Sequence, residues 1–169
     1  NSKNISAEKN QDYFLVNGNF ENDIIDLSKK DLDLLKDNLF FDTEFSKIRF
    51  SSNNNFSFKI DKKFRLKDQK IISKIKLHEA KILNNFNLKK IFPEVQNIIS
   101  LLDNKINLEY KDDIFLINGN GKVLFQKTED LISYKYEKKN NKFIFENLLQ
   151  IKQNPFHIEL LNYKKNIEE

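Results

Sequence analysis

The sequence predicts a mainly β protein: an antiparallel meander of amphipathic strands, arranged as a curved groove or an open sandwich, with one short helix near residues 90–103. Three observations lead to this fold class. Apolar and polar residues alternate in several short stretches, and clusters of Asn, Asp and Lys separate them, as is typical of half-buried strands joined by turns. In addition, 16 Phe and 5 Tyr in 169 residues supply more apolar side chain than a disordered chain carries.

The predicted strands follow this alternation along the chain. Five stretches alternate apolar and polar residues, at 56–60, 106–110, 132–136, 143–145 and 156–160. The clusters that we interpret as turns lie at 52–55, 61–63, 112–113, 138–142 and 153–155. Because successive side chains of a strand point to opposite faces, each stretch would present one apolar face and one polar face.

One stretch has helical spacing instead. Between residues 88 and 102, apolar side chains recur at Phe92, Val95 and Ile99, and Pro93 stands where the first turn of a helix tolerates proline. We expect a helix of about three turns here. The segment 28–39 has leucines at helical offsets but also alternates, so helix and strand both stay open, with strand preferred.

A short repeat suggests how the meander is organised. Phe14–Asn19 reads FLVNGN and Phe115–Asn120 reads FLINGN, and an Asn-rich turn and a Phe-x-Phe strand follow each copy. The sequence therefore predicts two β meanders joined by the helix. The expected boundaries are a flexible N-terminal segment at 1–10, a first meander at 11–87, the connecting helix at 88–104 and a second meander at 105–165.

The residues that carry most enzyme chemistry are scarce. The chain has no Cys, and neither His78 nor His157 has a second ligand at a spacing that binds metal. The three glycines, Gly18, Gly119 and Gly121, do not form a phosphate-binding loop and are expected at a strand bulge or tight bend. We therefore expect no enzyme, no metal and no cofactor.

Charge and hydropathy limit the partners. The net charge of +4 comes from 29 basic residues interleaved with 25 acidic ones, which is typical of a solvated surface, so nucleic acid is not an expected partner. The longest apolar runs, such as Ile114–Ile117, have four residues, whereas a membrane-spanning helix needs about 20. Membrane anchoring would therefore depend on segments outside this chain.

The apolar faces of the strands need a cover. They can pack on each other as a closed sandwich, or the sheet can curve around a lipid. One helix cannot cover so many strands. The alternation is compatible with both arrangements.

Several segments resemble a known family. Phe92–Val95, the alternating stretches 106–110, 132–136 and 143–145, the strand 115–122 that ends in Gly-x-Gly-Lys, and residues 160–165 resemble the AsmA-like envelope proteins of Gram-negative bacteria, in the branch that includes TamB and YhdP. Residues 1–50 match less well. The resemblance covers mainly residues 88–165. It implies a repeating β-groove fragment of a periplasmic, inner-membrane-anchored protein that carries phospholipid toward the outer membrane.

For this chain the resemblance implies a non-catalytic lipid-binding module. Its partners would be phospholipid and adjacent repeats of the same protein, which would pair through edge strands. The alternative is a structural or adhesive β-sandwich interaction domain with a closed core. The side chains expected to bury acyl chains are Phe56, Phe58, Ile60, Phe115, Ile117, Phe143, Phe145, Phe156, Ile158 and Leu160.

Overall fold

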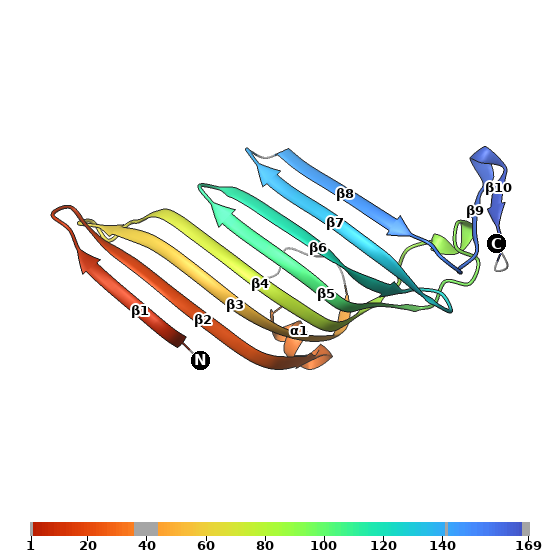
Figure 1. The fold of residues 1–169 in the computed structure, drawn as a ribbon, viewed down its shortest axis with the longest axis horizontal. Coiled ribbons are helices and arrows are strands. Elements are labelled where there is room, and N and C mark those ends of the chain that lie inside the picture. Colours follow the sequence, from red (N-terminus) through yellow and green to blue (C-terminus); the bar gives the residue numbers. More distant parts are fainter. Residues whose placement is uncertain (1, 36–43, 141, 167–169) are drawn as a thin grey trace.

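A single antiparallel sheet makes up most of the computed structural model, which describes residues 2–35, 44–140 and 142–166. Eight strands lie side by side in the order in which they follow one another along the chain (Figure 1). This arrangement confirms the prediction of a mainly β, antiparallel meander. The strands are β1 (Ser2–Lys9), β2 (Tyr13–Ser28), β3 (Phe45–Asp61), β4 (Leu66–Leu83), β5 (Ile98–Lys111), β6 (Ile114–Leu124), β7 (Glu129–Lys139) and β8 (Lys142–Gln150).

The connections divide the sheet into two ends. Short turns join β1 to β2, β3 to β4, β5 to β6 and β7 to β8 at one end, called the turn end below. At the opposite loop end, the β2–β3 connection contains helix α1 (Lys29–Leu35) and the β4–β5 connection contains the 3-10 turn η2 (Leu88–Lys90). Residues 125–128 join β6 to β7 there. After β8, β9 (Phe156–Ile158), the 3-10 turn η3 (Glu159–Leu161) and β10 (Tyr163–Lys165) form a separate small hairpin near the loop end (Figure 1).

The eight strands form one open layer, not a closed sandwich. The accessible surface is 12272 Å², whereas a compact monomer of this mass exposes about 8,800 Å². The excess of about 3,500 Å² shows that the chain is far less compact than a globular monomer of the same mass, as a single-layer sheet must be. In the described part of the chain the buried apolar side chains are few: Leu32, Leu77, Ala80, Val95, Val123 and Phe125.

The prediction of a helix near 90–103 is wrong. Residues 88–90 form η2, residues 91–97 continue as a loop, and β5 already begins at Ile98. The helical spacing has a tertiary cause. Phe92 and Val95 from the loop and Ile99 from β5 all pack around one small core, although they belong to different elements.

The preference for strand over 28–39 is wrong for residues 29–35, which form α1. Ser28 and Asp31 make a capping box, in which the Ser28 backbone N–H and hydroxyl donate to Asp31 Oδ2 at 2.9 and 2.5 Å. These hydrogen bonds hold the pKa of Asp31 below its usual value. Residues 36–39 of the predicted segment lie outside the described residues.

Three further expectations differ from the structure. Part of the N-terminal segment expected to be flexible forms β1 and pairs with β2. The connecting helix between two meanders is absent, and strands on both sides of it belong to one sheet. The turn expected at 52–55 lies inside β3, where Asn53 and Asn55 accept hydrogen bonds at 3.0 and 2.9 Å from Asn19 Nδ2 on β2. These cross-strand bonds satisfy amide groups that would otherwise favour a turn.

Candidate functional site

The strand register divides the sheet into an apolar and a polar face. Residues directly opposite one another on neighbouring antiparallel strands share a face. One such row runs from Gly18 through Phe56, Ile71 and Tyr110 to Phe115, across β2 to β6. The next row runs across β5 to β8 and consists of Leu108, Ile117, Tyr136 and Phe145. We call the face that carries these rows the apolar face.

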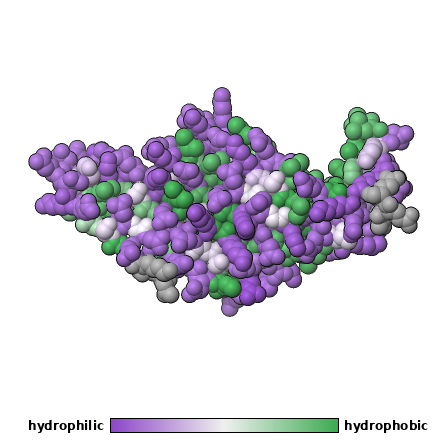
Figure 2. Space-filling model, in the orientation of Figure 1, coloured by the Kyte–Doolittle hydropathy of each residue, from purple (hydrophilic) through white to green (hydrophobic). Residues whose placement is uncertain are grey.

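The opposite side is the polar face. A complete row from β3 to β8 consists of Asn53, Lys74, Asn107, Asn118, Lys135 and Glu146. The side of the molecule shown in Figure 2 carries mainly hydrophilic residues, with apolar ones in small separate groups, as this register requires of the polar face. An open depression of ≈ 510 Å³ lies here, lined largely by Asn, Lys and Ser side chains of β5, β6 and β7.

Seven of the ten residues predicted to bind lipid lie on the apolar face. They come from three strands: Phe56, Phe58 and Ile60 from β3, Phe115 and Ile117 from β6, and Phe143 and Phe145 from β8. Phe143 and Phe145 are 61% and 66% exposed, because β8 is an edge strand. The structure thus brings together on one surface residues that are up to 89 positions apart in the sequence.

The other three predicted residues do not join this surface. Phe156 and Ile158 lie on β9, which belongs to the separate hairpin, and Phe156 packs on Tyr163 with ring centroids 5.5 Å apart. Leu160 lies in η3 and is 97% exposed. The strand predicted over 156–160 ends at Ile158, so its period-2 alternation does not continue to Leu160.

Both glycines of the sequence repeat lie under aromatic rings. A Cβ on Gly18 would stand 2.2 Å from Phe56 Cζ, and a Cβ on Gly119 would stand 2.2 Å from Tyr134 Cζ. Neither glycine is at the bulge or tight bend expected, and both keep an ordinary negative φ. The missing side chain instead lets the ring of the residue opposite lie flat across the apolar face. Each copy of the repeat thus has a glycine beneath an aromatic ring of the next strand: Gly18 in β2 lies under Phe56, and Gly119 in β6 lies under Tyr134.

Residues that the site prediction omitted extend the apolar face. Tyr136 contacts Phe115 and Phe143, with ring centroids 6.0 and 6.3 Å away. Burial raises the pKa of Tyr134, so its hydroxyl stays neutral near pH 7. The alternation over 106–110 and 132–136 was the sequence signal that could have identified the omitted residues of β5 and β7. The omitted members of the face include Phe14, Val16, Leu66, Ile71, Ile75, Ile106, Leu108, Tyr110, Ile132, Tyr134, Tyr136 and Leu149.

The loop between β4 and β5 closes the apolar face at the loop end. Val95 packs with Val123 and Phe125, and Phe92 meets Phe125 edge to face with ring centroids 4.8 Å apart. Ile99, Leu101, Ile132 and Leu149 border this core. Toward the turn end, in contrast, Phe14, Ile71, Phe143 and Phe145 are exposed. The face is therefore covered at one end and uncovered at the other.

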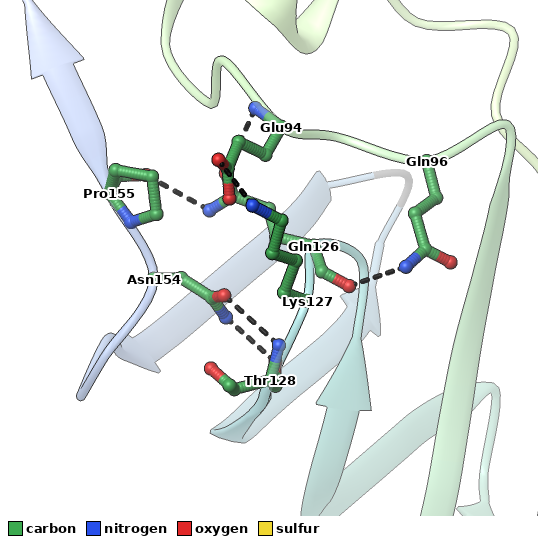
Figure 3. Close-up of polar contacts among 7 residues, drawn as sticks. All are labelled: Glu94, Gln96, Gln126, Lys127, Thr128, Asn154 and Pro155. Atoms are coloured by element: carbon green, nitrogen blue, oxygen red, sulfur yellow. Dashed lines mark hydrogen bonds and ion pairs between the residues drawn. The ribbon is translucent and has the colours of Figure 1, made fainter. Parts of the chain in front are cut away.

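Buried polar side chains hold the closing loops in place (Figure 3). Gln126 Nε2 donates to the Pro155 carbonyl at 3.0 Å, and Gln126 Oε1 accepts from the Glu94 backbone N–H at 3.2 Å. Asn154 Nδ2 donates to the Thr128 carbonyl at 2.7 Å, and Asn154 Oδ1 accepts from the Thr128 N–H at 3.1 Å. Loops after β4, β6 and β8 are thereby tied together, which fixes the closed end of the apolar face.

The described residues include two histidines, which lie outside the apolar rows. No three His, Asp or Glu side chains in the part of the chain that the structure describes gather as a possible metal site. His78 is 3.4 Å from Ser51 Oγ, and His157 belongs to the small hairpin. What the apolar face can do is bury another apolar surface.

Comparisons with known proteins add no relative. Neither a family model, a curated protein nor a solved structure matches this chain. Among the described residues, no helix is long and apolar enough to cross a bilayer. Inferences about function therefore depend on the residues and geometry described above.

Proposed function

We propose that this chain is a non-catalytic lipid-binding module whose apolar face holds phospholipid acyl chains. The observation that carries the proposal is the single-layer sheet. Its apolar face is uncovered from the closing core, formed by Val95, Val123 and Phe125, to the turn end. Leaving so much apolar surface in water costs about 25 cal/mol per Å², so a stable partner is expected there.

The shape of the apolar face favours an acyl chain as the ligand. Between Val123 at the closed end and Phe115 near the turn end, β6 advances eight residues, or about 26 Å along the strand. An extended acyl chain of a common phospholipid has a similar length. Aromatic and aliphatic side chains predominate in the lining. Lys138, opposite Phe143, lies near the turn end, whereas Asp130, opposite Val123 at the closed end, is buried. A phospholipid could lie along the strands with its tails toward the closing core and its headgroup at the turn end.

The alternative of a closed-core interaction domain receives less support. Its core would need a second layer on the apolar face, and the described residues supply only the loop-end cover. A protein partner could provide such a layer. The lipid proposal is preferred because aromatic and aliphatic side chains predominate on the apolar face, with Asn54 and Ser73 interrupting it on β3 and β4.

The edge strand β8 supports the proposed pairing with adjacent repeats of the same protein. β8 pairs with β7 on one side only, and it carries apolar side chains on both faces, including Ile144 and Leu148 on the polar face. Such an edge can accept another strand. A periplasmic setting and membership of the AsmA-like family remain part of this proposal, supported by the pattern of residues 88–165 and the open apolar sheet.

Native mass spectrometry with lipid extraction tests the proposal. Wild-type protein purified from a Gram-negative host should carry near-stoichiometric phospholipid, and Phe145→Asp should lose it because a carboxylate on the apolar face disfavours acyl chains. The same spectra report whether copies associate through the β8 edge.

Ile144→Asp is the matched control. Ile144 neighbours Phe145 on the same edge strand, is also exposed, and points to the polar face. This variant should keep the lipid. A lipid-free, cooperatively folding wild-type monomer, or equal lipid loss in both variants, would refute the acyl-chain site.

A further inference from the structure

The turn between β3 and β4 presents an aromatic residue in an unfavourable conformation. The Phe64 N–H donates to the Asp61 carbonyl at 2.9 Å and the Asp61 N–H donates to the Arg65 carbonyl at 3.1 Å, which defines a three-residue hairpin loop. Phe64 has φ 58°, the left-handed position that Gly or Asn normally fills in such a loop. A bulky residue there costs free energy without a local gain in packing.

Phe64 gains nothing from the fold in return. Its side chain is 88% exposed, and Leu66, two residues on, is also exposed. Asp61 holds the loop: its Oδ1 accepts from the N–H groups of Lys63 and Arg65 at 2.8 and 3.1 Å, and its Oδ2 accepts from Arg65 Nε at 2.8 Å. The loop is thus built to hold an apolar side chain out in solvent.

Cations surround this apolar tip. Residues 62–67 read Lys-Lys-Phe-Arg-Leu-Lys, with four cations and no acid. Lys62 pairs with Asp12 at 2.8 Å, and Arg65 and Lys67 share Asp61 at 2.7 and 3.3 Å. Lys63 has no acidic partner in the described part of the chain. Asp68, which pairs with Lys59 at 2.7 Å, also attracts Lys67, so three acids face five cations and the tip keeps a positive charge.

The tip is also continuous with the apolar face. Leu66 lies directly opposite Ile60, and Ile60 lies opposite Phe14, so an apolar row leads from the base of the loop across β4, β3 and β2. All three residues are at the turn end, where the apolar face is uncovered. A convex apolar tip with a cationic surround fits the interface of an anionic bilayer, where the ring enters the headgroup region and Lys and Arg contact phosphates.

We propose that the β3–β4 turn is a membrane-docking site, in which Phe64 inserts into a bilayer that contains anionic phospholipid while Lys62, Lys63, Arg65 and Lys67 contact the headgroups. Docking of this kind is peripheral and differs from an anchor that spans the bilayer. It does not depend on whether the apolar face binds acyl chains, and it would place the uncovered end of that face next to the membrane.

A single-tryptophan experiment tests insertion directly, because the chain has no Trp. The Phe64→Trp variant should show a blue-shifted emission with vesicles of phosphatidylglycerol and phosphatidylcholine, and brominated acyl chains should quench it. The matched control is Phe86→Trp, since Phe86 is also an exposed Phe but lies in the loop-end connection. Its emission should not change. Equal responses of the two variants would overturn the assignment to this turn.

Vesicle cosedimentation supplies the second test. Phe64→Asn should weaken binding about tenfold or more through the lost apolar group, and Lys63→Gln about fivefold. Asn tolerates the left-handed conformation, so Phe64→Asn should fold at least as stably as wild type, which separates lost docking from lost structure.

Two further outcomes bear on the proposal. Binding of wild type should fall with added salt and on vesicles of phosphatidylcholine alone, and equal binding to both vesicle types would overturn the role of the cations. Phe64→Asn that binds like wild type would overturn the docking site. Phe64→Asn should still copurify with lipid, and Phe145→Asp should still cosediment, so failure of the acyl-chain site and failure of the docking site can be distinguished.

Discussion

Replacing Asn154 by Ala should strongly destabilise the fold, because this buried side chain joins two loops. Asn154 is 1% exposed and lies between β8 and β9. Its Nδ2 donates to the Thr128 carbonyl at 2.7 Å and to Asp130 Oδ2 at 2.6 Å, and its Oδ1 accepts from the Thr128 N–H at 3.1 Å. Alanine removes all three hydrogen bonds.

The magnitude follows from the type of each bond. Two bonds join neutral groups and contribute about 0.5–1.5 kcal/mol each, while the bond to the Asp130 carboxylate contributes about 1.5–3 kcal/mol. Asp130 is equally buried and keeps only the bond from the Lys152 N–H to its Oδ1, at 2.9 Å. Asn154→Ala should therefore lower the free energy of unfolding by about 3–5 kcal/mol, a large part of the 5–15 kcal/mol that a typical domain has.

Urea denaturation followed by circular dichroism measures this loss. The neighbouring Gln153→Ala is the matched control, because Gln153 is exposed, and it should change the free energy of unfolding by less than about 0.5 kcal/mol. A double-mutant cycle with Asp130→Ala should show coupling between the two residues. A loss below about 1 kcal/mol for Asn154→Ala, or additive effects in the cycle, would refute the reasoning.

Two other predictions concern the glycines and the β3–β4 turn. Gly121→Ala should lower the free energy of unfolding by about 1–3 kcal/mol, because its Cβ would stand 2.6 Å from the backbone Cα of Asn104. The atoms nearest to a Cβ at Gly18 belong to the Phe56 ring, which can rotate away, so Gly18→Ala should lower the free energy of unfolding less. Urea midpoints test this order, and the reverse order would contradict it. The hydrogen bond from Arg65 holds the pKa of Asp61 well below its usual value, so Asp61 adds stability above about pH 3.9 that is lost as the pH falls further. Arg65→Gln should move the pKa of Asp61 up toward about 3.9 in a carbon-13 NMR titration, and the stability difference from wild type should shrink in acid. An unchanged titration would show that Arg65 does not hold this carboxylate.

The hydrophobic pattern was a reliable guide where strands are regular. Phe56, Phe115 and Phe143 were expected on one apolar surface, and the register places them there. Alternation works because a side chain's face depends only on its parity along the strand. The same rule failed at Leu160, since η3 ends the strand before the alternation does.

Turn propensity was less reliable. Asn53, Asn54 and Asn55 predict a turn but lie in the middle of β3, where their amide groups find partners on neighbouring residues. The capping box at Ser28 and Asp31, in contrast, was a helix signal in the sequence that the alternating leucines obscured. Local preference decides an element only when no partner across the sheet competes with it.

The sequence by itself determined the class of fold, the two-faced strands and seven residues of the apolar face, because these depend on spacing along the chain. Only the tertiary structure decided that both predicted meanders form one open layer and that Phe92 and Val95 close its loop end. It alone also showed that Gly18 and Gly119 lie beneath aromatic rings and that Phe64 projects from a turn. These features depend on which distant residues meet, and neither periodicity nor propensity carries that information.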